Sequence, residues 1–457
     1  MTNTTWQQGE VIELEISDLS DTGDGVGRFD QRVVFVPDTV VGDRALVQLL
    51  YVKPKYAHGK LKELLQRSPQ RIRPSCIVAD KCGGCEWQHI NYDYQLTAKQ
   101  NQVIQALERI GGFVSPPVDP ILGATSPLGY RNKATYPLGV SATGQVQAGY
   151  YQKGSHQLIN LNQCPVQDTR LNPLLTQVKQ DIQKHGWSIY HEQRHQGQLR
   201  HLGLRIGRRT GEMLLTLVVK NWNLPGIETQ AQEWLQRYPQ LVGVSLNLNS
   251  DRTNAIFGSQ TRCLAGVPYL REQFAGLEFH IGPDTFFQIN TETAETLLQV
   301  IKSELNLQGH ETLVDAYCGI GTLTLPLAKQ ARQVTGLEVQ PAAVEQAIVN
   351  AQLNGINNVT FQVGAVEKIL PNLGIIPDIV ILDPPRKGCE PNVIKSLLDL
   401  KPSRIVYVSC KIATLARDLK LLCEAGIYSV TRVQPADFFP QTAHVEAVAF
   451  LSSSHLE

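Results

Sequence analysis

The second half of the chain repeats one pattern that strongly limits its fold. After Gln308, short apolar runs alternate with longer stretches of helical periodicity, and the runs lie at 312–316, 334–337, 359–363, 379–382 and 405–408. Short apolar runs separated in this way are typical of βαβ units, whose strands form a parallel sheet with helices on both faces. The sequence therefore predicts an α/β fold for a C-terminal domain over residues 283–457.

The N-terminal region, residues 1–66, has a different period. Ile12, Leu14 and Ile16 alternate with polar residues, as in a half-buried strand, and the following glycines and prolines mark turns. We expect five short strands that form a small OB-like β-barrel. The segments GDGVGRF at 23–29, VVFVPDTVVGD at 33–43 and KPKYAHGKLKEL at 53–64 resemble the TRAM domain. That resemblance implies RNA binding.

The middle region, residues 67–282, is harder to interpret and is expected to be an α+β domain. Residues 94–110 have a helical pattern, and 204–219 read as two strands around a turn at 208–211. With 457 residues, the chain is long enough for about three domains. No apolar run reaches the roughly 18 residues of a membrane span, and the N-terminus lacks a secretory signal pattern. We expect a cytoplasmic monomer without a membrane partner.

The overall charge does not favour a polyanion, because Lys plus Arg equals Asp plus Glu at 42 residues each. Two segments depart from this balance. Residues 51–75 carry seven bases and one acid, and residues 194–209 carry five arginines and no acid. Such runs are usually solvated surface, although two basic patches would also suit RNA.

A glycine turn follows the first apolar run of the C-terminal domain. Gly319 and Gly321 would let the backbone approach a ligand, and Glu338 closes the next predicted strand, where a carboxylate can accept ribose hydroxyls. No basic residue near the turn awaits a phosphate, so the pattern favours S-adenosylmethionine (SAM). Asp383 opens the segment DPPRKG directly after the strand at 379–382 and is expected at the same sheet edge.

A cysteine and a carboxylate are expected at this edge as well. Cys410 comes straight after the run at 405–408, and its neighbour Lys411 would favour the nucleophilic thiolate. Glu446 precedes the last apolar strand, and it reaches the same edge only if that strand is antiparallel. A nucleophile and a base would then converge on one substrate.

The chain resembles the RNA uracil-5-methyltransferase family in ordered motifs that cover nearly its whole length. These are YRNKATYPLG at 130–139, TFFQIN at 285–290, DAYCGIGTLTLPLA at 315–328, DPPRKG at 383–388, YVSCKIATLARDL at 407–419 and FPQTAHVE at 439–446. The resemblance implies a Rossmann-like SAM-dependent methyltransferase domain. It also implies that Cys410 is the nucleophile and Glu446 the base, and that Gln288, Tyr317, Glu338 and Asp383 contact SAM.

The chemistry of this family explains these residue types. Carbon 5 of uracil is a poor nucleophile until a thiolate adds to carbon 6, and a base must later remove the carbon-5 proton. Phe286 or Phe287 would stack on the extracted base. One departure stands out, because Lys411-Ile412 replaces the usual Asn-Pro and leaves that Asn contact in doubt. Tyr317 replaces the commoner Phe and keeps the ring.

Four further cysteines form a ligand-like set. Cys76, Cys82 and Cys85 have the spacing C-x5-C-x2-C, and Cys164 lies far downstream. The spacing alone is compatible with zinc or with a 4Fe-4S cluster. These cysteines and the TRAM-like start resemble the 23S rRNA branch of the family, which implies a 4Fe-4S cluster with a structural role and 23S rRNA as substrate.

Three alternatives remain at this stage. tRNA is the rival substrate for the same chemistry. Radical methylthiotransferases also combine a TRAM-like barrel, an iron–sulfur cluster and SAM, but they use C-x3-C-x2-C and place the barrel last. An RNA-binding or assembly protein without catalysis is the third alternative, and it draws on Lys411-Ile412.

Overall fold

The computed structural model describes residues 6–453, and its N-terminal part is a closed five-stranded barrel with strand order β1-β2-β3-β5-β4. The strands are β1 Val11–Leu19, β2 Gly25–Phe29, β3 Arg32–Val36, β4 Arg44–Val52 and β5 Tyr56–Gln66. Ile12, Leu14 and Ile16 are buried in the barrel core, as the alternating pattern predicts. The expected OB-like barrel is confirmed.

The central part of the chain forms a mixed seven-stranded sheet with strand order β12-β11-β10-β9-β6-β7-β8. Its strands are β6 Lys133–Val140, β7 Val146–Tyr151, β8 Leu158–Asn160, β9 Leu199–Ile206, β10 Met213–Val219, β11 Leu241–Leu248 and β12 Gln260–Gly266. A 3-10 turn (Thr169–Leu171) and the helices α2 (Asn172–His185) and α3 (Ile227–Arg237) contribute to its core. The strand pair expected at 204–219 is the antiparallel pair β9 and β10.

The C-terminal part forms the sheet predicted from the βαβ pattern, with strand order β17-β16-β15-β18-β19-β21-β20. Its strands are β15 Thr312–Ala316, β16 Gln333–Glu338, β17 Val359–Val363, β18 Ile379–Leu382, β19 Arg404–Ser409, β20 Tyr428–Ala436 and β21 Glu446–Ser453. The first five are parallel, whereas β21 runs antiparallel to both β19 and β20. The antiparallel last strand that the sequence required is therefore present.

Each face of this sheet carries its own core, because successive strand residues point to opposite sides. Val314 and Val380 pack with α7 (Val366–Ile369), α8 (Pro391–Leu400) and α9 (Ile412–Glu424). The other face includes Leu313 and Ile379. It is covered by α4 (Thr291–Leu305), α5 (Thr324–Ala328), α6 (Pro341–Leu353) and the hairpin of β13 (Leu270–Phe274) and β14 (Leu277–Ile281). A 3-10 turn, Leu370–Asn372, follows α7.

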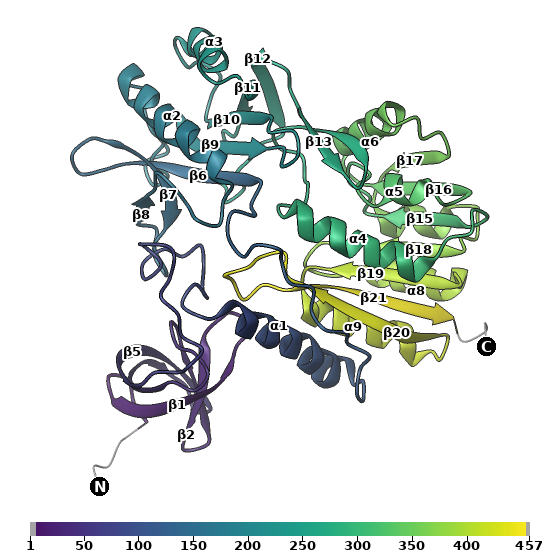
Figure 1. The fold of residues 1–457 in the computed structure, drawn as a ribbon, viewed down its shortest axis with the longest axis horizontal. Helices are drawn as coiled ribbons and strands as arrows, with labels where there is room; N and C mark the ends of the chain where they lie inside the picture. The colour runs from purple at the N-terminus through teal and green to yellow at the C-terminus, as the bar shows by residue number, and fades with distance from the viewer. Residues whose placement is uncertain (1–5, 454–457) are drawn as a thin grey trace.

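Helix α1, Tyr92–Ala106, continues into a π-helical turn at Leu107–Gly111 and agrees with the helix expected at 94–110. It lies beside α9 and β20 of the C-terminal sheet rather than on the central sheet, as Figure 1 shows. Val103 and Leu107 belong to the core of that face. The N-terminal half of the chain thus supplies a helix that packs on the C-terminal sheet.

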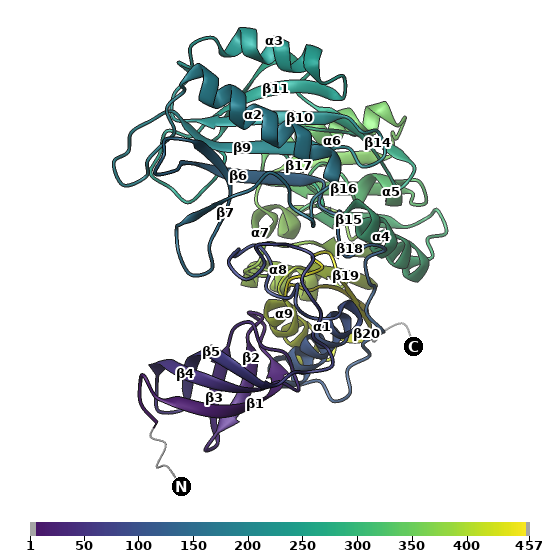
Figure 2. The ribbon, with the colours of Figure 1, turned by 60° about the vertical axis from the view of Figure 1, so that its left-hand side comes forward.

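A buried ion pair fixes α1 to the loop between β20 and β21. Lys99 Nζ lies 2.6 Å from Asp437 Oδ1, and both side chains are fully buried. The Gln95 side chain accepts a hydrogen bond from the backbone N–H of Gln441 and donates one to its side-chain oxygen. α1 therefore holds the loop that leads into Glu446, while the barrel lies on the far side of α1 in Figure 2. Within residues 6–453, no helix is both long and apolar enough to span a bilayer.

Candidate active site

The strand order reverses between β15 and β18, and in open α/β sheets the carboxyl ends at such a reversal form the ligand crevice. The chain turns sharply after β15, with left-handed backbone at Tyr317 (φ 71°) and Gly319 (φ 54°). Below the turn, Asp315 accepts a hydrogen bond from the Thr324 hydroxyl through Oδ2, but its buried Oδ1 has no partner among the described residues. A buried acceptor left open in this way suits a cationic or N–H-bearing ligand.

The crevice is rich in carboxylates. Glu338 ends β16 and accepts hydrogen bonds from the backbone N–H of Gly319 (3.2 Å) and of Gln340 (2.8 Å). Burial raises the pKa of Asp315 to about 7. Burial and the neighbouring Glu446 and Asp315 hold the pKa of Asp383 well above its ordinary value. This acidic lining fits SAM, which carries a sulfonium and an ammonium group.

Cys410 and Glu446 meet at the same sheet edge. Ser409 and Ala447 are paired in the antiparallel register of β19 and β21, so Cys410 and Glu446 are the residues one step beyond that pair. Glu446 is buried, which raises its pKa to about 8. Burial, Glu446 and Asp383 together raise the pKa of the Cys410 thiol.

The cation that opposes these shifts is Arg386. Its charge lowers the pKa of both Cys410 and Glu446 against the effect of burial. Lys411, the cation expected from the sequence, pairs through Nζ with Asp21 of the barrel at 3.1 Å and is not among the main contributors to the Cys410 pKa. Its role toward the thiolate stays a prediction.

His444 is a second residue that the sequence did not single out. Its Nε2 lies 3.8 Å from Glu446 Oε1, and burial lowers its pKa to about 4. An uncharged imidazole gives Glu446 no countercharge near neutral pH. Both Arg386 and His444 lie inside quoted motifs, DPPRKG and FPQTAHVE, so motif membership was the available signal.

The two phenylalanines of TFFQIN have different environments. Phe287 is 4% exposed and packs edge-to-face on Phe274, whereas Phe286 is 71% exposed. Phe287 is therefore a core residue, and Phe286 is the ring available to a ligand. The backbone carbonyl of Gln288 accepts a hydrogen bond from the Asn132 side chain at 2.8 Å, and the Asn290 side chain donates to the carbonyl of Phe438.

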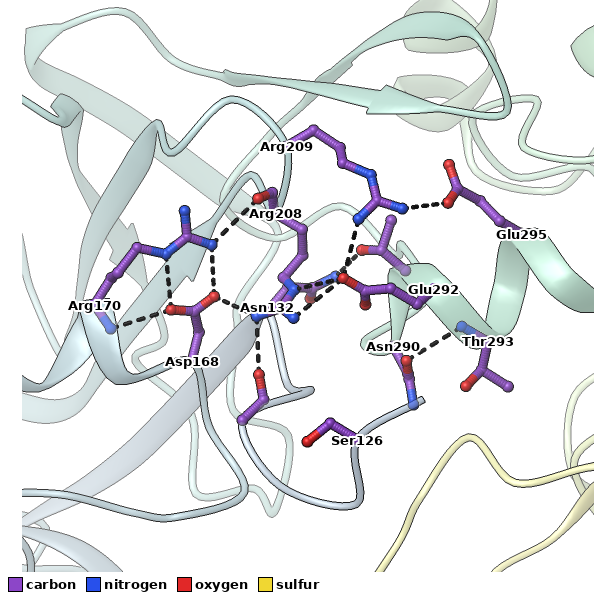
Figure 3. A network of polar contacts seen from close by, with 12 residues as sticks. Ser126, Asn132, Asp168, Arg170, Arg208, Arg209, Asn290, Glu292, Thr293 and Glu295 are labelled. Atoms are coloured by element: carbon purple, nitrogen blue, oxygen red, sulfur yellow. Dashed lines mark hydrogen bonds and ion pairs between the residues drawn. The ribbon is translucent and has the colours of Figure 1, made fainter. Parts of the chain in front are cut away.

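A polar network anchors this segment to the central domain (Figure 3). Arg208 pairs with Asp168 and with Glu292 of α4, and Arg209 pairs with Glu292 at 3.1 Å and Glu295 at 2.5 Å. The Asn290 side chain caps α4 by accepting from the Thr293 N–H. Arg208 and Arg209, two of the five arginines in the run at 194–209, thus form ion pairs that join the central domain to α4.

The four remaining cysteines converge. Cys76, Cys82, Cys85 and Cys164 line one cavity of about 50 Å³ together with Arg131. All four are free thiols, and burial raises the pKa of Cys85 to about 12. Within the described residues, no group of three or more Cys, His, Asp or Glu is arranged so that it would hold a metal ion. The arrangement brings the predicted ligands together without showing a metal site.

Comparisons with known proteins agree with this geometry. A TRAM domain model matches residues 5–62, a methyltransferase domain model matches 307–434, and a tRNA (uracil-5-)-methyltransferase model matches 91–370. A protein of Nostoc sp. described as an uncharacterized RNA methyltransferase is 78% identical over 99% of this chain and 98% of its own. One of Bacillus cereus with the same description is 40% identical over 97% of each chain.

The crystal structure of Pyrococcus abyssi tRNA (uracil-54, C5)-methyltransferase in complex with S-adenosyl-L-homocysteine is similar over 96% of this chain and 100% of that one. Its TM-score is 0.78 and its identity 28%. The barrel, the crevice and these similarities define a SAM-dependent RNA methyltransferase. The chain belongs to the tRNA (uracil-5-)-methyltransferase family. This membership separates it from the radical methylthiotransferases.

Proposed function

We propose that this enzyme methylates carbon 5 of a uridine in RNA through a transient bond between Cys410 and carbon 6 of the base, with Glu446 as the base that resolves the adduct. The observation that carries the proposal is the meeting of Cys410 and Glu446 at the crevice edge, beside Asp383. Each supplies one of the two functions that the reaction needs, a nucleophile and a proton acceptor.

The proposed reaction proceeds through an addition, a methyl transfer and an elimination. The Cys410 thiolate forms a bond to carbon 6, and the ring electrons move to carbon 5, which takes the methyl group. Glu446 then removes the carbon-5 proton, and the returning electrons expel the thiolate. Because burial and nearby carboxylates raise the pKa of Cys410, the thiolate needs a countercharge, and Arg386 is the cation beside it.

When it is bound, SAM would supply an electrophilic methyl group, and the broken sulfur–carbon bond would leave S-adenosylhomocysteine as the neutral thioether product. We assign Glu338 to the ribose hydroxyls, and Gln288, Tyr317 and Asp383 to further contacts with the ligand. Support comes from the left-handed turn at Tyr317 and from Asp315 Oδ1, a buried acceptor without a partner among the described residues. The exposed ring of Phe286 is suited to stack on the extruded uracil, which recovers part of the cost of flipping.

The first proposed substrate is 23S rRNA, modified in the cytoplasm by a monomeric enzyme. tRNA is the second candidate, and one observation favours it: the Pyrococcus abyssi enzyme, named for uracil 54 of tRNA, is similar over 96% of this chain, including the barrel. A TRAM-type barrel therefore does not separate the two substrates. Mapping 5-methyluridine in rRNA and tRNA from cells with and without the gene decides between them.

The enzymatic test compares two cysteine variants. Cys410→Ala is expected to lower methyl transfer to unmodified RNA by at least about 100-fold. Cys423→Ala, which alters a free thiol near the far end of α9, is the matched control and should keep full activity. Undiminished transfer by Cys410→Ala would refute the covalent mechanism.

We also propose that Cys76, Cys82, Cys85 and Cys164 hold a 4Fe-4S cluster with a structural role, because four thiols line one cavity beside the cation Arg131. Protein purified without oxygen should contain iron and absorb at about 400 nm. Cys82→Ser should lose both signals, whereas Cys263→Ser, on β12, should retain them. Zinc without iron in the purified protein would replace this proposal.

A further inference from the structure

The outer surface of the barrel carries four rings that touch one another, which we call the ring patch: Phe35 on β3, Tyr51 on β4, and Tyr56 and His58 on β5. Phe35 lies stacked on His58 with centroids 5.2 Å apart, and Tyr56 meets His58 edge-on at 5.9 Å. Tyr51 closes the group at 6.5 Å from Tyr56. Tyr51 and Tyr56 are 47% and 38% exposed, so this is a surface cluster and not part of the core.

Strand geometry gathers cations around these rings. Along β5, Tyr56, His58 and Lys60 are exposed, whereas Ala57 and Gly59 between them are buried. The next strand residues therefore continue the same outer face with positive charge. Lys53 Nζ lies 5.0 Å from the centre of the Tyr51 ring, and Lys55 and Lys62 are also exposed. Rings surrounded by lysines are suited to unpaired nucleotides, whose bases stack and whose phosphates are anionic.

The ring patch is continuous with the active site. Asp21, in the loop between β1 and β2, pairs with Lys411 at 3.1 Å, next to Cys410. The same loop contributes Gly23 and Asp24 to a cavity of about 500 Å³. Val26 on β2, two residues after Asp24, is the register partner of Phe35 in the ring patch. One short loop thus links the residue beside the nucleophile to the rings.

The cavity lies between the barrel, the cysteine loop and the end of β7. Lys153 closes one side by pairing with Asp38 at 2.5 Å. Asp24 and Glu86 also line it.

We propose that the ring patch is a stacking platform for single-stranded RNA that flanks the target uridine. The inference rests on the proposed RNA substrate and adds a specific surface and a path: from Cys410, over the β1–β2 loop, to the outer face of β3, β5 and β4. Figure 2 shows this sheet of the barrel at the end of the molecule remote from the central domain. The platform reads the presence of unpaired bases and not their sequence.

The test uses full-length protein and a fluorescein-labelled single-stranded oligouridylate of roughly 12 nucleotides, within the range bound by one OB-like fold. The variant Tyr51→Ala/Tyr56→Ala should bind it about 10-fold to 100-fold more weakly. Tyr51→Phe/Tyr56→Phe keeps the rings and should bind as wild type. Val11→Ala/Leu65→Ala removes two similarly exposed apolar side chains of the barrel outside the ring patch and is the matched control.

Each outcome decides the matter. Unchanged binding by the alanine pair, equal loss in the phenylalanine pair, or equal loss in the control would overturn the platform. A duplex of the same length should bind the wild type and the alanine pair equally, because its bases are already stacked. In methyl transfer, the alanine pair should raise KM and spare kcat. If no RNA is methylated at all, the binding measurements still stand, so failure of the proposed function is distinguishable.

Discussion

Cys410 and Glu446 face each other across two antiparallel strands, one step beyond the registered pair of Ser409 and Ala447. In a fully parallel sheet, only the carboxyl ends of strands would lie at this edge. Because β21 runs antiparallel to β19, the start of β21 lies at the same edge. The proposed nucleophile and the carboxylate therefore stand directly after the end of β19 and at the start of β21. Loop movement is not needed to bring them together.

The first prediction concerns the fate of the proposed adduct. Glu446→Gln keeps the shape of the side chain but cannot accept the carbon-5 proton, so the methylated adduct should accumulate. The measurement is a protein–RNA band that survives denaturing electrophoresis. Cys410→Ala/Glu446→Gln should show no such band, and free turnover by Glu446→Gln would reject the assigned role.

Glu446 should also make stability depend on pH. Its pKa is about 8 in the folded protein against an ordinary 4.5, because burial penalises the charged form. The stability contributed by the protonated group is fully present below pH 4.5, the ordinary pKa, and is lost as the pH rises to about 8. The total loss in the free energy of unfolding is about 5 kcal/mol. Glu446→Gln removes this loss.

Thermal unfolding checks this directly. Glu446→Gln should unfold at a higher temperature than wild type at about pH 8.5, and the difference should shrink toward about pH 4.5. A matched carboxylate is Glu424, at the exposed end of α9, and Glu424→Gln should show no such trend. Equal pH dependence of wild type and Glu446→Gln would contradict the burial of this charge.

Arg386 should control the pH dependence of catalysis. It is the cation that lowers the pKa of both Cys410 and Glu446. Arg386→Gln should therefore move the rising limb of kcat/KM to higher pH, by about one unit, since nearby charges shift pKa values on that scale. Arg386→Lys keeps the positive charge and should leave the rising limb close to its wild-type position. Lys411→Gln should also leave the limb in place. A displaced limb in Lys411→Gln would return the role to that residue.

The buried pair of Lys99 and Asp437 should be costly to break. Lys99→Met leaves Asp437 uncompensated in the core and should destabilise the protein by about 3–5 kcal/mol. Urea unfolding followed by tryptophan fluorescence reports this, because Lys99 Nζ lies 5.8 Å from the centre of the Trp87 ring. Lys99→Met/Asp437→Asn should recover most of the loss.

The control for that prediction is a solvated pair. Lys420 and Glu424 are one helical turn apart on α9 with about half of each side chain exposed. Lys420→Met should cost less than about 1 kcal/mol. Equal losses at Lys99 and Lys420 would mean that the buried pair does not hold α1 in place.

The periodicity of apolar residues predicted most strands of the C-terminal sheet. The strands at 312–316, 359–363 and 379–382 begin and end where the apolar runs do. The central strands β15 and β18 are apolar because helices cover both faces of the parallel sheet there. The crevice position followed from topology alone. The charge environment of Cys410 did not, since it depends on Arg386, which is distant in sequence and close in space.

The placement of α1 was equally beyond local patterns. Residues 94–110 announced a helix, but the helix packs with α9, whose sequence begins more than 300 residues later. The domain boundary at 283 stays a prediction, and so do the SAM contacts and the cluster ligands. What the sequence lacked was the identity of long-range partners, which only the folded arrangement supplies.

The position of α1 has a consequence for synthesis and for engineering. On the ribosome this helix leaves the exit tunnel well before α9 and β20 exist, so the face that it buries in the folded protein, Gln95, Lys99 and Val103, stays without its partners for most of translation. A recombinant fragment that starts at residue 283 would have the reverse defect, with the α9 surface that contacts Val103 and Leu107 left bare. The nascent chain and the truncated fragment would each expose a surface that only the docked helix covers.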